Sequence, residues 1–369
     1  MQRGLKLFVL VGVCLAVCMA DGRLVAATHL KKGGYAVTDP RYAGADFRIQ
    51  GEFQGSFDTG QGWQKTGLQV VSRGHGVFDA VLFPGGLPGS GWTGWSQVPL
   101  TGKRTQNWVE LRGGYYHIVV EGRTALVYTA NGHPLGQIAR VVRRSPSMGT
   151  PPPWGAQILF NGQRSDQLVN PRISPQGWLM EGTRTRNLYR DYTMHVEFRL
   201  PYMPHSTGQA RANSGVYLQS RYEVQILDSF GLEGLHNECA GLYKFRRPDV
   251  NMCLPPLVWQ TYDIEFRSPR FNSQGRKTED AVITVWHNGV AVHRNVSLPK
   301  KTGGGAQEAP ELLPIKLQDH KNPVRFRNVW IHDHSHRSPS PYAAVIGTQI
   351  PYSPNPQLTP RPKRPYWAY

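Results

Sequence analysis

Short apolar runs recur along most of this chain, and glycine, proline or asparagine closes each of them. The runs are rich in Val, Ile, Tyr and Phe, which favour strands. No long stretch repeats apolar residues at i, i+3 and i+4, as an amphipathic helix would. The pattern therefore predicts an all-β protein. The expected strands are 47–53, 67–71, 78–83, 108–111, 116–121 and 124–128, then 192–200, 214–219, 222–227, 260–267, 281–287, 290–296, 315–318 and 324–331.

Proline-rich and turn-rich stretches divide this series of strands. We expect a smaller β-rich N-terminal domain over 30–142, a semi-rigid Pro-rich linker over 143–154, and an antiparallel jelly-roll sandwich over 155–333. The last stretch, 334–369, is basic and rich in proline and has no acidic residue, so we expect a disordered tail. The 40 Gly, 29 Pro and 11% aromatic residues also favour two β-rich domains over helical bundles.

A glycine-rich segment interrupts the first domain. Gly89, Gly91 and Gly94 match the dinucleotide-binding pattern G-x-G-x-x-G, but Trp92 and Trp95 interrupt it and no amphipathic helix follows. We therefore expect a glycine-rich β-hairpin loop that binds no dinucleotide. The two tryptophans either pack against the domain or stack on sugar rings, and the sequence leaves both readings open.

The N-terminal segment and the net charge indicate the cellular location of the protein and its partners. Residues 1–20 have a basic start, an apolar run and a small residue at the end, which predicts a removed signal peptide and an exported protein with no transmembrane segment. The formal net charge is +17, and the chain carries no known nucleic-acid-binding signature. We expect no nucleic-acid partner, and binding to anionic envelope polymers through the basic tail.

Four cysteines fall into two pairs. Cys14 and Cys18 leave with the signal peptide, so the mature chain keeps Cys239 and Cys253. A disulfide is the simplest expectation for such a pair in an exported protein. Two buried free thiols are the alternative, and no C-x-x-C spacing supports a thiolate metal site.

The segment from Asn213 to Gly231, NSGVYLQSRYEVQILDSFG, reads as two adjacent strands with polar residues at strand spacing. Alternation places Glu223 and Gln225 on one face of the second strand, opposite its apolar residues. One inserted bulge residue would bring Asp228 to the same side. Either these groups form a catalytic cluster, or they form an ordinary solvated outer face.

At this point the second domain resembles the 3-keto-disaccharide hydrolase family, a concanavalin A-like jelly roll of exported bacterial proteins. The resemblance rests on an ordered series of segments, and the region before it resembles the β-rich extension found ahead of this module in planctomycete-like bacteria. The matching segments are HVEFR (195–199), NSGVYLQSRYEVQILDS (213–229), WQTYDIEFRSPRF (259–271), HNGVAVHRNVSLP (287–299) and LQDHKNPVRFRNVWI (317–331).

The resemblance implies an enzyme that cleaves glycosides oxidised to a ketone at C3, a glycoside hydrolase or lyase. A ketone at C3 acidifies the hydrogen on C2, so proton abstraction, elimination of the C1 group and hydration would break the bond. Such chemistry needs a general base, a stabiliser for the enolate oxygen and an acid for the leaving group.

Particular side chains are candidates for these roles. Glu223 is the expected base, and we expect it to converge with Gln225 and with at least one of three residues: His195, Arg199 and His320. The catalytic candidates are Glu223, His320 and Asp228, and the candidates for substrate binding are Gln225, His195, Arg199, Lys244 and Gln318.

No cofactor is expected, although a divalent metal is an open alternative. His332, His334 and His336 alternate and would lie on one side of a strand, at the edge of the predicted tail. The alternative function is a non-catalytic glycan-binding module of the cell envelope, since the same sandwich also serves as a lectin scaffold. A third alternative is an envelope protein held by charge.

Overall fold

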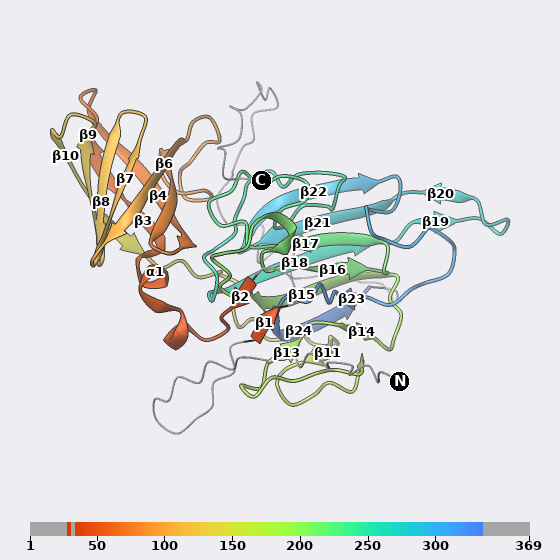
Figure 1. Cartoon of the computed structure of the whole chain (residues 1–369). Helices are drawn as coiled ribbons and strands as arrows, with labels where there is room; N and C mark the ends of the chain where they lie inside the picture. Colours follow the sequence, from red (N-terminus) through yellow and green to blue (C-terminus); the bar gives the residue numbers. More distant parts are fainter. Residues whose placement is uncertain (1–27, 31–33, 335–369) are drawn as a thin grey trace, which may run out of the picture.

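The computed structural model describes residues 28–30 and 34–334 (Figure 1). The predicted signal peptide, the predicted tail from residue 335 onward and His336 lie outside the described residues. In the described part of the chain, no helix has the length and apolar run that crossing a bilayer requires.

Eight antiparallel strands of the N-terminal half close into a barrel, seen on the left of Figure 1. Alternate residues of its strands fill the interior with a packed apolar core that includes Phe53, Phe57 and Phe78. The strands are β3 (Gly51–Asp58), β4 (Trp63–Gly74), β5 (Val77–Pro84), β6 (Val98–Thr105), β7 (Trp108–Gly113), β8 (Tyr116–Glu121), β9 (Thr124–Thr129) and β10 (Pro134–Val141), in the order β10-β3-β4-β5-β6-β7-β8-β9. Before the barrel lie β1 (Thr28–Leu30), β2 (Gly34–Ala36), η1 (Pro40–Tyr42) and α1 (Gly44–Ile49).

Three of the barrel's elements differ from the sequence prediction. The strand expected over 47–53 is half helix, because α1 runs to Ile49 and β3 begins at Gly51. Strands β6 and β10 were not predicted, since they are rich in polar, glycine and proline positions, and β10 buries only Ile138. Both strands have hydrogen-bond partners on either side, β6 between β5 and β7, and β10 between β3 and β9, where the barrel closes. No helix begins at Gly91.

The C-terminal half is a sandwich of two antiparallel sheets, so the prediction of an all-β sandwich is confirmed. The larger sheet has the order β11-β24-β15-β18-β21-β22, with β13 paired to β24, and the smaller sheet has the order β12-β14-β23-β16-β17. The elements are β11 (Gln157–Phe160), β12 (Leu168–Val169), β13 (Leu179–Met180), β14 (Thr183–Thr185), β15 (Asp191–Arg199), η2 (Gly208–Ala210), β16 (Ser214–Leu218), β17 (Tyr222–Ile226), β18 (Trp259–Arg267), β19 (Arg270–Phe271), β20 (Lys277–Glu279), β21 (Ala281–His287), β22 (Val290–Leu298), β23 (Lys316–Leu317) and β24 (Arg325–Asp333).

One hydrophobic core lies between the two sheets. Met194, Val196 and Phe198 of β15 meet the core from one side, and Val224 and Ile226 of β17 belong to the same cluster. Since successive side chains of a strand point to opposite faces, the polar residues of β15 and of β17 lie on the two outer faces of the sandwich. This arrangement separates the polar groups of the two strands by the full core.

The barrel and the sandwich pack directly on each other. Val71, Phe83 and Leu87 of the barrel side belong to the same hydrophobic cluster as the sandwich core. The hydroxyl groups of Ser72 and Tyr202 lie 2.7 Å apart across the contact. The barrel is therefore held by apolar burial as well as by the covalent connection.

The Pro-rich segment between them is docked from Arg143 to Thr150 rather than acting as a free spacer. The Ser147 hydroxyl donates to Asp263 (2.6 Å), the Gly149 N–H donates to Glu197 (2.6 Å), and the Thr150 carbonyl accepts from the Asn328 amide (3.0 Å). This segment thus covers the outer face of the larger sheet, where Asp263 and Glu197 lie.

Candidate functional site

The outer face of the smaller sheet carries a cluster of polar side chains around Glu223. Tyr217 of β16 is directly opposite Glu223 of β17, and Gly215 is opposite Gln225. Lys316 of β23 is opposite Tyr217 on the other side. Residues opposite each other in a sheet share a face and lie about 5 Å apart, so three strands bring a carboxyl, a phenol and an ammonium group together.

The Glu223 carboxyl group is buried, with 2% of the residue exposed. Its Oε2 atom has no hydrogen-bond partner among the described residues. Burial raises the pKa of Glu223, while a hydrogen bond with Tyr217 and the charge of Lys316 act to lower it; the pKa is raised to about 7. A carboxylate with this pKa is a far stronger base than an ordinary glutamate and still ionises near neutral pH.

Glycine residues make room for this cluster. A Cβ atom at Gly215 would lie 2.4 Å from Glu223 Oε1, so only glycine leaves space for the carboxyl group in this position. A Cβ atom at Gly304 would lie 2.9 Å from the Tyr217 hydroxyl. The loop that contains Gly304 also holds Thr302, whose hydroxyl accepts from the Glu223 N–H (2.7 Å).

Tyr217 links the carboxyl group to its neighbours. Burial and the nearby Glu223 raise the pKa of Tyr217, which keeps its hydroxyl protonated and able to donate. The Lys316 Nζ atom lies 4.3 Å from the centre of the Tyr217 ring. The Gln318 amide nitrogen lies 3.4 Å from the Tyr217 hydroxyl, and Gln318 Oε1 is buried with no partner among the described residues.

Amide groups lie on the other side of Glu223. In the orientation that satisfies its neighbours, the Gln225 amide donates to the Ser214 carbonyl (2.8 Å) and to Glu223 Oε1 (3.2 Å). The side-chain amides of Gln225 and Gln209 are 3.0 Å apart. Lys244 is exposed on the adjoining loop, which is attached to β17 by the Tyr243 N–H donating to the Glu223 carbonyl (3.1 Å). The predicted residues Gln225, Gln318 and Lys244 therefore do lie in or beside the Glu223 cluster.

The predicted convergence of Glu223 with His195 or Arg199 is wrong. Both residues belong to β15, on the outer face of the larger sheet, and the core separates them from Glu223. The Arg199 guanidinium stacks over Trp178 (4.9 Å to the ring centre) and donates to the Leu257 carbonyl (3.0 Å). Arg199 is thus a packed residue far from the candidate site.

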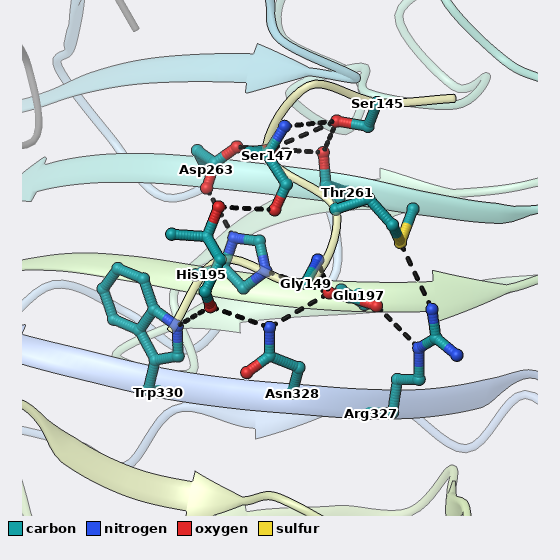
Figure 2. Close-up of polar contacts among 12 residues, drawn as sticks. Ser145, Ser147, Gly149, His195, Glu197, Thr261, Asp263, Arg327, Asn328 and Trp330 are labelled. Carbon is teal, nitrogen blue, oxygen red and sulfur yellow. Dashed lines mark hydrogen bonds and ion pairs between the residues drawn. The ribbon is translucent and has the colours of Figure 1, made fainter. Parts of the chain in front are cut away.

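His195 is the centre of a buried polar network (Figure 2). Its Nδ1 lies 2.6 Å from Asp263 Oδ1, its Nε2 lies 3.6 Å from Glu197 Oε1, and its ring stacks on Trp330. Burial alone would lower the pKa of His195, but Asp263 and Glu197 raise it to about 9. The imidazole is therefore a cation held between two carboxylates, which joins the docked 143–154 segment to the sheet.

Glu197 is equally constrained in this network. Burial alone would raise its pKa, but the neighbouring His195 and hydrogen bonds from Asn328, Arg327 and the Gly149 N–H lower the pKa to about 2. Arg327 donates to one carboxylate oxygen (2.6 Å), and Asn328 donates to the other (3.0 Å). Because both oxygens of the Glu197 carboxylate already accept hydrogen bonds, this group stabilises the fold and is a poor base.

Asp228 also lies elsewhere than predicted. Strand β17 ends at Ile226, and no bulge returns Asp228 to the side of Glu223. Its carboxylate accepts from the Arg211 guanidinium (2.6 Å) and from the Phe230 N–H (3.3 Å), and the side chain is fully buried. The predicted acid is therefore one half of a buried ion pair and stabilises the loops after β17.

His320 lies in the turn after β23 and is exposed. Among the described contacts, none joins its imidazole to Glu223, although Gln318, two residues earlier, belongs to the cluster. Its predicted catalytic role stays a prediction.

The predicted disulfide is absent, because Cys239 and Cys253 are both free and buried. Their thiols are neighbours, and the Cys239 Sγ also lies 3.1 Å from the Tyr262 hydroxyl. Burial raises the pKa of the Cys253 thiol well above its ordinary value. The two residues are thus small apolar members of the sandwich core.

The histidines proposed as metal ligands do not form a site in the described part of the chain. His332 and His334 contact each other edge to face, and the Thr193 hydroxyl lies 2.8 Å from His334 Nε2. No group of three or more His, Cys, Asp or Glu side chains among the described residues is arranged to hold a metal ion.

Sequence reasoning missed Tyr217 and Lys316, although a signal for both was present. Tyr217 alternates with Gly215 in the quoted NSGVYLQS segment, and Lys316 alternates with Gln318 in the predicted strand 315–318. Extending the alternation argument from Glu223 to the neighbouring strands would have placed both side chains on one outer face.

The fold is an antiparallel β-sandwich, and its match to a family model supports a carbohydrate-active function. Residues 154–332 match the family model of the 3-keto-alpha-glucoside-1,2-lyase-like domain, so the sandwich unit is similar to that family.

No curated protein matches the chain. Three solved structures of candidate glycosyl hydrolases from Parabacteroides distasonis ATCC 8503 are similar to it. They are 26%, 17% and 19% identical, with TM-scores of 0.44, 0.37 and 0.34. The matches cover 49%, 48% and 48% of this chain and 84%, 94% and 98% of the respective structures.

Proposed function

We propose that the cluster around Glu223 is the catalytic site of an enzyme that cleaves 3-keto-glycosides. The observation that carries the proposal is the Glu223 carboxyl group, which is buried, has one unpartnered oxygen among the described residues and has a pKa raised to about 7. A perturbed carboxyl group among convergent polar side chains is characteristic of a general base. The similarity of the sandwich unit to that family supports the choice of substrate class.

The proposed reaction begins with Glu223 removing the C2 proton, whose acidity comes from the ketone at C3. The Lys316 ammonium and the Tyr217 hydroxyl stabilise the negative charge that develops on the ketone oxygen. The enolate then expels the C1 oxygen, which takes up one proton, for which His320 is our candidate donor. Addition of water across the C1–C2 double bond completes net hydrolysis.

The remaining side chains of the cluster are suited to holding the sugar. Gln225 and Gln318 present amide groups, and Gln318 Oε1 has no partner among the described residues. Lys244 is exposed at the edge of the cluster. We propose that these groups bind sugar hydroxyls, and that the enzyme works outside the cytoplasm after removal of residues 1–20.

An assay of the purified protein on a 3-keto-glucoside, beside the same glucoside without oxidation, tests the proposal. We expect turnover of the ketone only, because the unoxidised sugar has no acidic C2 hydrogen. Equal turnover of both sugars would indicate ordinary glycoside hydrolysis, and binding without turnover would indicate a glycan-binding module.

The pH dependence of the reaction gives a sharper test. Because Glu223 must be ionised to act as a base, we expect kcat/KM to rise with pH and to level off above about 7. Replacing Lys316 by methionine removes a charge that lowers the pKa of Glu223, so the rise should move to higher pH. The substitution of Lys316 should also lower kcat, because the enolate loses a stabilising cation.

A Lys300→Met variant is the matched control, since Lys300 lies between β22 and β23 and exposes its charge to solvent. Its profile should keep the wild-type midpoint. An unchanged midpoint in Lys316→Met, measured on the same substrate, would contradict the proposed pairing of Lys316 with the base.

A further inference from the structure

A cavity of about 570 Å³ lies where the barrel meets the sandwich, and no residue of the Glu223 cluster lines it. Four segments form its walls: the loop between β5 and β6, the start of the docked 143–154 segment, the loop that precedes β18, and the β21–β22 hairpin. Its volume is within the range of about 300–1,000 Å³ typical of small-molecule sites.

The walls of this cavity meet where the backbone of a glycine lies close to a side chain of another wall. A Cβ atom at Gly89 would lie 2.5 Å from the Met252 Sδ, and a Cβ atom at Gly289 would lie 2.3 Å from a carbon of Pro146. Both glycines have positive φ angles, 72° and 78°. Both positions therefore require glycine, because of the positive φ angle and because there is no space for a Cβ atom. The cavity is preformed rather than a loose gap between two units.

The lining of the cavity is cationic. Arg143, Arg144 and Arg294 belong to the lining, which contains no aspartate or glutamate. Arg143 is already engaged, since it donates to Glu52 (2.5 Å) and to the Pro88 carbonyl (2.6 Å). Arg144 and Arg294 are exposed, and no acidic partner is recorded for either among the described contacts. Two guanidinium groups are therefore available to an anion.

The two tryptophans of the β5–β6 loop have different roles. Trp92 is 6% exposed, packs edge to face on Phe83 and donates its indole N–H to the Ser96 carbonyl (2.6 Å). Trp95 lines the cavity and is 58% exposed. Trp92 thus anchors the loop, while Trp95 offers an open aromatic face of the kind that stacks on the apolar face of a sugar ring.

We propose that this cavity binds an acidic saccharide, with Trp95 stacked on a sugar ring and Arg144 and Arg294 paired with a carboxylate or sulfate group. Guanidinium groups recognise planar carboxylates and sulfate-like anions through paired hydrogen bonds. The site would attach the protein to an anionic glycan, and the proposal does not depend on the role of Glu223.

Titration of the full chain with trigalacturonate, followed by calorimetry and tryptophan fluorescence, tests this site. A sulfated galactose disaccharide distinguishes sulfate from carboxylate recognition, and a neutral galactose disaccharide tests the need for charge. We expect at least one acidic sugar to bind at least tenfold more tightly than the neutral one. Trp95→Ala, Arg144→Ala and Arg294→Ala should each weaken that binding by about tenfold.

Matched controls are Trp63→Ala, which removes an exposed barrel tryptophan, and Arg276→Ala, which removes an exposed arginine in the turn between β19 and β20. Both should bind like the wild type. The proposal is overturned if no acidic sugar binds, if the neutral sugar binds equally well, if the three cavity variants bind like the controls, or if a short polyglutamate peptide binds as tightly as the acidic sugar.

Discussion

Replacing Glu223 by glutamine is expected to lower turnover of a 3-keto-glycoside by about 10²–10⁴-fold, the usual contribution of a general base. Glutamine has the shape of the carboxyl group and keeps the contact with Tyr217, but it cannot accept the C2 proton. The measurement is kcat on the ketone substrate at pH 8, where the wild-type carboxyl is ionised.

The same substitution should stabilise the protein at that pH. The folded chain holds the Glu223 proton up to about pH 7, whereas an ordinary glutamate releases it near 4.5, so wild-type stability falls as pH rises between these values. At about 1.4 kcal/mol for each pKa unit, Glu223→Gln should be more stable by up to about 3 kcal/mol at pH 8. At pH 4 the two proteins should unfold alike.

Glu121→Gln is a suitable control, because Glu121 is exposed on the barrel and should affect neither activity nor stability. Wild-type turnover in Glu223→Gln would remove Glu223 as the base. Lost turnover together with lost stability would show that the carboxyl group serves the fold instead.

Replacing Glu197 by alanine is expected to destabilise the protein by about 3–5 kcal/mol, because it removes one partner from a buried network of ion pairs. The substitution removes the acceptor for Arg327, Asn328 and the Gly149 N–H and leaves His195 with Asp263 alone. The free energy of unfolding in urea at pH 7 measures the effect. Below the unfolding transition, turnover per folded molecule should not change, because the core separates Glu197 from Glu223.

Glu279→Ala is the comparison for this variant, since Glu279 pairs with Arg267 on the surface of the same sandwich and both side chains are about half exposed. A surface pair contributes about 0–1 kcal/mol. Equal, small losses in both variants would show that the His195 network adds little to stability.

The His195 network also predicts how stability depends on pH. His195 has a folded pKa of about 9 against an ordinary 6.5, so its contribution is complete below about pH 6.5 and is lost as pH rises through 9. Glu197 has a folded pKa of about 2, so its contribution is present above 4.5 and is lost as pH falls through 2. The pKa shifts of His195 and Glu197 describe the same ion pair, so their contributions to the free energy of unfolding are not added together.

Much of the sandwich follows from local patterns. The strand predicted over 281–287 matches β21, and the one predicted over 222–227 differs from β17 by one residue. Alternation also placed Glu223 and Gln225 on the polar face, where both are found. These features depend on the two-residue period of a strand and on turn residues, which neighbouring positions in the chain specify.

The failures concern partners that are distant in the chain. The outward side chains of β15 and β17 alternate equally well, so the pattern could not reveal that His195 and Glu223 lie on opposite sides of one core. The partner of Asp228 is Arg211, a loop residue that no spacing rule connects to it. Cys239 and Cys253 are free thiols in the sandwich core, where the export context favoured a disulfide.

The sequence alone therefore determined the all-β class, most of the strands and which side of each strand is polar. The tertiary structure decided which polar faces meet, because sheet order is a matter of long-range pairing and core packing rather than of local period. It brought Tyr217 and Lys316 beside Glu223, and it covered the His195 network with residues 143–154. It also joined the barrel to the sandwich around the cavity of Trp95 and Arg294. A strand's period states only which side chains point outward, and the neighbours that pack there decide whether they meet solvent, substrate or another segment of the chain.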